Sequence, residues 1–155
     1  MLTHQLYTSD ETGAMKVTSI RSAASFKQTV LLIDDQPTVL AIHTAILKSL
    51  KMNLKIISMT NPQEALEWMK NKQVDLLVTD YRMQPMDGVS FLNAIKHENC
   101  YPHTSTIVVT VIKDKNILQD LLTAGATACL SKPVNPEDLK KLAQSLLIKN
   151  KQLAS

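Results

Sequence analysis

The chain has 155 residues, of which 45% are hydrophobic and 20% are charged, and its formal net charge at pH 7 is +3. This length and composition are typical of one soluble globular domain with its own core, and they exclude a largely disordered chain. The longest apolar runs contain only a handful of residues, far fewer than the roughly 20 that a membrane-spanning helix needs. The N-terminus shows no secretory leader and the two cysteines form no disulfide framework, so we expect a cytoplasmic protein. The small positive excess is scattered and lacks interleaved aromatic residues, so neither a nucleic acid nor a membrane is expected as a partner.

Residues 1–27 differ in composition from the rest of the chain, because Ser, Thr, Ala and isolated charges dominate and no hydrophobic period persists. We expect a flexible N-terminal arm here, with a short helical turn as an option around residues 16–24. Residues 28–150 are expected to form the folded domain, followed by a C-terminal tail at 151–155.

From Thr29 onward, short apolar runs alternate with stretches of helical period. The apolar runs predict five strands, at 29–33, 54–59, 74–78, 106–109 and 127–130. The helical stretches predict five helices, which begin near Pro37, Pro62, Val89, Lys115 and Pro136. Asn61 and Asn135 stand where N-caps are preferred, and Gly125 is suited to a helix C-terminus. Five strand–helix units with short loops predict an α/β fold, a doubly wound parallel sheet with helices on both faces.

Polar residues follow four of the predicted strands at the end where an open α/β sheet binds its ligands. They are Asp34 and Asp35, Asp80, Thr110, and Lys132. Any one of them alone would be an ordinary cap or turn residue, but three converging carboxylates would repel one another without a cation. An all-oxygen site suits Mg²⁺, while a lysine and a hydroxyl can hold phosphoryl oxygens. The set therefore predicts phosphoryl transfer onto a carboxylate.

The chain from about residue 29 to 148 resembles the receiver domain of bacterial two-component response regulators. The motifs that carry the resemblance are LLIDDQP, VDLLVTDYRMQPMDG, IVVTV, the AGA at 124–126 and SKPVNPEDL, in this order. The resemblance implies a flavodoxin-like (βα)₅ fold with strand order 2-1-3-4-5. By this resemblance Asp80 matches the phosphoacceptor, Thr110 the switch hydroxyl and Lys132 the lysine of the site. Asp34 and Asp35 match the acidic pair at the metal, with Asp35 favoured as direct ligand, and the backbone carbonyl of Arg82 matches the third protein ligand. The peptide bond between Lys132 and Pro133 is expected to be cis.

The resemblance also implies a stand-alone, chemotaxis-regulator-like receiver that is no enzyme beyond accepting and losing its own phosphoryl group. Its donor would be a phosphohistidine on a sensor histidine kinase or histidine phosphotransfer protein, and its cofactor Mg²⁺. The phosphorylated form would change its affinity for a downstream protein through the face of the fourth helix, fifth strand and fifth helix. The resemblance leaves open whether phosphorylation causes the protein to form a dimer. Two alternatives remain: a phosphorylation-independent pseudo-receiver and, less favoured, a small aspartate-nucleophile phosphatase, which would need an Asp-x-Asp motif and a cap domain.

Three positions depart from the family pattern. The usual proline of the loop after Asp80 is replaced by Gln84 and follows one position later as Pro85, so the loop is expected to differ in shape. Val111 stands where Ala, Ser or Gly is usual, and its bulk is expected to slow the access of phosphodonor or water. Cys129 stands where an aromatic residue is common, so we expect a weaker or different conformational switch.

Overall fold

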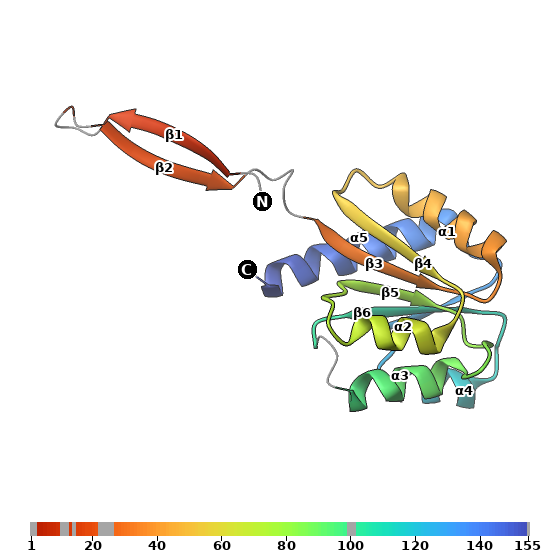
Figure 1. Ribbon diagram of the computed structural model, residues 1–155. Coiled ribbons are helices and arrows are strands. Elements are labelled where there is room, and N and C mark those ends of the chain that lie inside the picture. The colour runs from red at the N-terminus through yellow and green to blue at the C-terminus, as the bar shows by residue number, and fades with distance from the viewer. Residues whose placement is uncertain (1–2, 10–12, 14, 22–26, 99–101, 155) are drawn as a thin grey trace.

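The five apolar runs form one parallel sheet in the computed structural model, which describes residues 3–9, 13, 15–21, 27–98 and 102–154 (Figure 1). The strands are β3 (Gln28–Ile33), β4 (Leu54–Met59), β5 (Leu76–Thr79), β6 (Ser105–Thr110) and β7 (Ala128–Ser131), and their order is β4-β3-β5-β6-β7. Val30 of β3 lies opposite Ile56 on one side and Leu76 on the other. Numbered within this sheet the order is 2-1-3-4-5, which confirms the predicted fold.

Helices cover both faces of the sheet because successive residues of each buried strand point to opposite sides. The helices are α1 (Pro37–Lys48), α2 (Pro62–Met69), α3 (Gly88–His97), α4 (Lys115–Thr123) and α5 (Pro136–Ala154). On β3, Leu32 packs with Leu47 of α1 and Leu139 of α5, whereas Leu31 packs in the cluster that contains Phe91 of α3 and Leu121 of α4. No helix in the described residues is both long and apolar enough to cross a membrane.

Short polar side chains define where the helices begin. The side chain of Asn61 accepts hydrogen bonds from the backbone N–H groups of Gln63 and Glu64, at 2.8 and 3.3 Å. Asn135 does the same for the first turn of α5, so both predicted N-caps are confirmed. Gly125 follows the last residues of α4 with φ +116°, a conformation that favours glycine.

The N-terminal segment differs from the sequence-based expectation. Residues Thr3–Ser9 and Met15–Arg21 form two antiparallel strands, β1 and β2, with Thr3 opposite Arg21. The helical turn considered around residues 16–24 is therefore wrong for the described part of that range, and residues 22–24 lie outside it. The β-branched residues at 17–18 and 20 favour an extended backbone, and cross-strand pairing satisfies its hydrogen bonds.

Candidate functional site

Three carboxylates meet at the carboxyl end of the sheet. Asp34 and Asp35 directly follow β3, and Asp80 directly follows β5, the neighbouring strand. Sheet hydrogen bonding continues to these positions, because the N–H of Asp80 donates to Ile33 O at 3.2 Å. One carboxylate oxygen from each of the three aspartates lies within 4.8 Å of the others. Asp34 and Asp80 are buried, while Asp35 is exposed.

Lys132 brings a positive charge to this cluster from the end of β7. Its backbone N–H donates to Thr110 O at 2.9 Å, which continues the pairing between β7 and β6. Its Nζ donates to Asp34 Oδ2 at 2.7 Å and to Asp80 Oδ2 at 3.0 Å. Burial alone would lower the pKa of Lys132, but its hydrogen bonds to the two carboxylates and their charges outweigh it and raise the pKa. The ammonium group is therefore charged in the neutral range and links the two buried carboxylates.

The other oxygens of the buried carboxylates are held by backbone amides. Asp34 Oδ1 accepts from the N–H of Gln36 at 2.9 Å, and Asp80 Oδ1 accepts from the N–H of Tyr81 at 2.7 Å. Partial burial raises the pKa of the Asp35 carboxyl, and the charge and hydrogen bonding of Asp34 and the charge of Asp80 raise it further. Asp35 is thus the most accessible of the three aspartates, and its neighbours disfavour its ionised form.

The donor set fits a hard divalent cation. Three ionised carboxylates and one ammonium carry a formal charge of −3 + 1 = −2, and a dication balances it. All the side-chain donors are oxygens, which is the preference of Mg²⁺.

A hollow of about 280 Å³ opens above the cluster. It is lined by Asp35, Gln36, Asp80, Arg82, Val111 and Lys132, which come from the loops that follow four strands of the sheet. Thr110 is buried and lines a neighbouring hollow of about 160 Å³ together with Cys129. The Thr110 hydroxyl accepts a hydrogen bond from the N–H of Ile112 at 3.2 Å.

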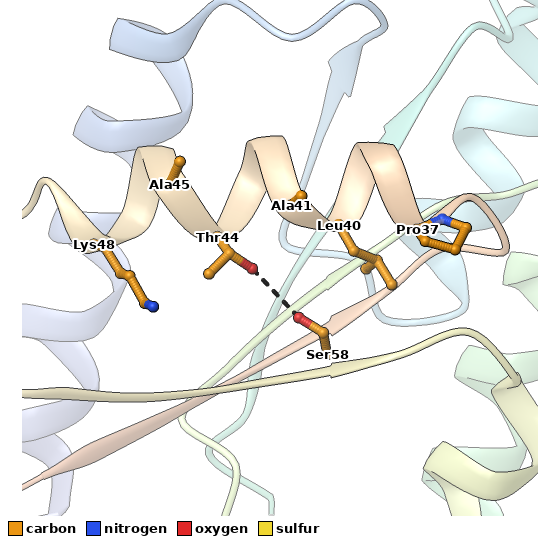
Figure 2. Close-up of a pocket in the computed structure, with 7 residues that line it drawn as sticks. All are labelled: Pro37, Leu40, Ala41, Thr44, Ala45, Lys48 and Ser58. Atoms are coloured by element: carbon orange, nitrogen blue, oxygen red, sulfur yellow. Dashed lines mark hydrogen bonds between the residues drawn. The ribbon is translucent and has the colours of Figure 1, made fainter.

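A larger hollow of about 490 Å³ lies elsewhere, between α1 and the edge strand β4. Figure 2 shows Leu40 and Thr44 of α1 facing Ser58 of β4, with a hydrogen bond of 3.3 Å between the Thr44 and Ser58 hydroxyls. The residues lining it include no carboxylate, and Lys48 is its only ionisable one. By size this hollow would be the candidate functional site, but the charged and polar side chains favour the smaller hollow at the acidic cluster.

Gly88 closes the loop that follows Asp80, and the sequence analysis included it in a motif without assigning it a role at the site. Its N–H donates to Tyr81 O at 2.7 Å. A Cβ at position 88 would lie 3.0 Å from Tyr81 Cα and 3.2 Å from Asp80 O, both of them backbone atoms. A side chain at this position would require the Tyr81 and Asp80 backbone to move by a few tenths of an ångström, so glycine suits the close approach of α3 to the Asp80 backbone. The sequence signal that indicates this position is the Asp-Gly pair at the start of a helix, where Asp87 is the N-cap.

Two proline peptide bonds near the site are cis. Lys132–Pro133 is cis, as expected from the resemblance, and so is Gln84–Pro85 in the loop where the proline is shifted by one position.

Comparisons with known proteins identify relatives of this chain. Residues 30–144 match the model of the response regulator receiver domain. The cyclic di-GMP phosphodiesterase response regulator RpfG of Xanthomonas campestris is 30% identical over 118 residues, which cover 76% of this chain and 31% of the relative. A probable chemotaxis protein CheY of Rhizobium etli is 27% identical over 117 residues, covering 76% of this chain and 90% of the relative. The chain thus spans less than a third of the first of these two relatives.

Solved structures show the same fold. A CheY-like receiver domain protein of Methanospirillum hungatei superposes with a TM-score of 0.71 and 26% identity, covering 82% of this chain and 98% of the other. The chemotaxis response regulator CheY4 of Vibrio cholerae gives a TM-score of 0.70 and 26% identity, with coverages of 78% and 99%.

Proposed function

Because the chain belongs to the response regulator receiver domain family, we propose that Asp80 accepts a phosphoryl group and thereby switches the affinity of the protein for a downstream partner. The observation that carries this proposal is the position of Lys132 Nζ, which bonds Asp34 and Asp80 at once beside the exposed Asp35. The nucleophile Asp80, the cation of Lys132 and the second carboxylate of Asp35 then line one open hollow. Receiver domains are in general signalling modules, and we propose no catalytic turnover of a separate substrate.

In the proposed reaction a carboxylate oxygen of Asp80 attacks the phosphorus of a phosphohistidine on a sensor histidine kinase or phosphotransfer protein. The new O–P bond forms an acyl phosphate, the N–P bond breaks, and the imidazole nitrogen leaves with the bonding electron pair. Lys132 lies 3.0 Å from Asp80 Oδ2 and is placed to hold a phosphoryl oxygen. The Thr110 hydroxyl, whose oxygen accepts a hydrogen bond from Ile112 N–H, would donate its own proton to another phosphoryl oxygen.

Mg²⁺ is the proposed cofactor, held by Asp34, Asp35, Asp80 and the backbone carbonyl of Arg82. When bound it would neutralise charge between the carboxylates and the phosphoryl oxygens. The charge of −2 and the all-oxygen donor set support this assignment.

The proposed output surface is the face formed by α4, β7 and α5. Thr110 ends β6, which is paired with β7, and the backbone of Lys132 bonds directly to its carbonyl. A change at Thr110 is therefore transmitted by direct contact to this face. Cys129 on β7 replaces the usual aromatic residue, so the change is proposed to depend on Thr110.

The test is intact-mass spectrometry after incubation with acetyl phosphate, with and without Mg²⁺. The wild-type protein should gain one phosphoryl group in the presence of Mg²⁺, and Asp80→Asn should gain none. Asp87→Asn is the matched control, because Asp87 caps α3 outside the cluster and asparagine caps equally well. No adduct from either acetyl phosphate or a phosphohistidine donor would refute the proposal in favour of a pseudo-receiver, and repeated turnover would indicate a phosphatase.

A further inference from the structure

The edge strand β4 leaves the hydrogen-bonding groups of its outer side without a strand partner. It is the last strand of the five-stranded sheet, and among the described residues it pairs only with β3. The carbonyl of Met59 points to β3, because it accepts a hydrogen bond from Asp34 N–H at 3.3 Å. Peptide groups point alternately to the two sides of a strand, so the outer side carries those of Leu54, Ile56 and Ser58. Such an edge can accept a further strand.

β4 also has few of the features that protect an edge strand from pairing. Proline, bulges and several charged side chains usually serve this purpose. The strand LKIISM contains no proline, and Lys55 is its only charged residue. Its apolar side chains are half-buried, whereas those of the central strand β5 are all buried. A further strand would therefore bury apolar surface as well as pair the backbone.

The hollow of about 490 Å³ between α1 and β4 lies beside this edge. Its walls include Ala41 and Ala45 of α1, which are exposed and small, and Ser58 of β4 (Figure 2). Side chains of a strand alternate between its two faces. Alternate side chains of a strand added to β4 would therefore enter this hollow.

The β1–β2 hairpin pairs with no other strand in the described part of its own chain. Its strands form a separate two-stranded sheet, which lies away from the five-stranded sheet in Figure 1. An isolated two-stranded hairpin is marginally stable in water, so a third strand would stabilise it. β1 has seven residues and β4 has six, and Leu6 and Tyr7 are adjacent near the centre of β1. Because successive residues of a strand point to opposite faces, one of the two would face the hollow in either orientation.

The charges of the hairpin sequence and of β4 are complementary at one end. The connection between β1 and β2, residues 10–14, contains Asp10 and Glu11 and no basic residue, and we call it the acidic connection. Lys51 and Lys55 are exposed at the start of β4, and we call them the basic start. Opposite charges that meet at an interface favour one orientation of the partners.

The chain's own hairpin would place the acidic connection at the wrong end of β4. β3 begins six residues after Arg21, the end of β2, and its first residue Gln28 lies opposite Leu54, the first residue of β4. If the hairpin joined its own β4, this short linker would hold Arg21 near Leu54 and leave the acidic connection roughly 20 Å away, near Met59. The hairpin of a second copy has no such restraint and can bring the acidic connection to the basic start.

We propose that the β1–β2 hairpin of one copy of this chain adds to the edge strand β4 of a second copy, with β1 antiparallel to β4. Ser9, the last residue of β1, then lies beside the basic start of β4. Two copies exchange hairpins about a two-fold axis, so that both β4 edges are covered. The contact involves no residue of the acidic cluster and does not depend on phosphorylation.

The experiment is analytical ultracentrifugation of the full chain from low-micromolar to submillimolar concentration, without Mg²⁺ or phosphodonor. The wild-type protein should show a concentration-dependent equilibrium between monomer and dimer. Ser58→Pro removes an outward N–H and leaves the pairing with β3 intact, so it should raise the dissociation constant of the dimer about ten- to a hundredfold, since the lost bond occurs twice. Ser58→Ala is the matched control: it also loses the hydrogen bond to the Thr44 hydroxyl but keeps the N–H, and its dissociation constant should stay within about threefold of wild type.

A second variant tests the hollow without changing the strand. Ala45→Arg fills the hollow from an exposed position of α1, so it should raise the dissociation constant at least about fivefold while the domain stays folded. Thr38→Arg is its control, because it adds the same charge at an exposed position of α1 outside this hollow. Lys55→Glu should also weaken the dimer, and added salt should weaken the wild-type dimer more than the Lys55→Glu dimer.

Amide hydrogen exchange locates the contact. The amides of Leu54, Ile56 and Ser58 should exchange more slowly as the protein concentration rises, because the added strand pairs them. A wild-type protein that stays monomeric over the whole range overturns the proposal, and so does a dimer that Ser58→Pro and Ala45→Arg leave unchanged, because its interface would lie elsewhere. Slow exchange of these amides in the monomer would overturn it too, since the chain's own hairpin would then cover β4.

Discussion

Lys132→Met should destabilise the protein strongly when Mg²⁺ is absent and much less when it is present. Methionine keeps most of the length of the side chain but removes the ammonium group that bonds Asp34 Oδ2 at 2.7 Å and Asp80 Oδ2 at 3.0 Å. The side chains of these three residues are 16%, 2% and 11% exposed, in the order Lys132, Asp34, Asp80. The substitution therefore leaves two buried carboxylates beside Asp35 without the ammonium group that bonds them.

Removing one partner of a fully buried ion pair costs about 3–5 kcal/mol. The hollow admits solvent, so we expect a loss of about 2–4 kcal/mol in the free energy of unfolding, which corresponds to a melting temperature lower by about 5–12 °C for a domain of this size. Because the pKa of Lys132 is raised above the ordinary lysine value of 10.5, its stabilising contribution is complete at neutral pH and is lost only as pH rises through the folded-state pKa. A bound dication neutralises the same carboxylates, so saturating Mg²⁺ should recover more than half of the loss.

The assay is urea unfolding of the wild type and Lys132→Met at pH 7, in EDTA and in saturating Mg²⁺. Lys113→Met is the control, since Lys113 is exposed. A loss below about 1 kcal/mol in EDTA, or an equal loss with and without Mg²⁺, would refute the electrostatic account, because a surface salt bridge is worth that little.

Three further variants test other parts of the site. Asp35→Asn should stabilise the Mg²⁺-free protein by less than about 1 kcal/mol. Since the pKa of Asp35 is raised above 3.8, this gain in stability should appear as pH rises past that value. Denaturation midpoints of the variant that differ from those of the wild type by the same amount at pH 4 and at pH 7 would contradict this prediction. Gly88→Ala should slow phosphorylation of Asp80 by roughly tenfold or more, because its Cβ would meet the Asp80 and Tyr81 backbone; rates equal to those of Ser90→Ala, an exposed neighbour, would argue against this. Val111→Ala should speed acetyl phosphate labelling about two- to fivefold, because Val111 is 57% exposed on the wall of the hollow; an unchanged rate would show that its bulk is not limiting.

The sequence by itself determined the order and type of the elements in the domain. Strand and helix periods depend on residues two to four positions apart, and caps such as Asn61 act within one helical turn. These signals can therefore be recognised from the sequence alone. The polar residues that follow the apolar runs could also be recognised as site candidates, because parallel strands bring their carboxyl ends to one edge of the sheet. The N-terminal strands were missed, because residues 3–9 and 15–21 carry weak periodicity and are defined by pairing with each other.

Only the tertiary structure decided how the site residues share their interactions. Lys132 is 98 residues from Asp34 and 52 from Asp80 along the chain, and no local pattern predicts that one ammonium group bonds both. The structure also placed Thr110 on a neighbouring hollow, left Asp35 exposed, and brought Gly88 against the Asp80 backbone. These features depend on packing several loops onto one sheet edge, where differences of an ångström decide which atoms meet. Periodicity predicts which residues approach that edge, and only the packed fold determines their contacts and exposure.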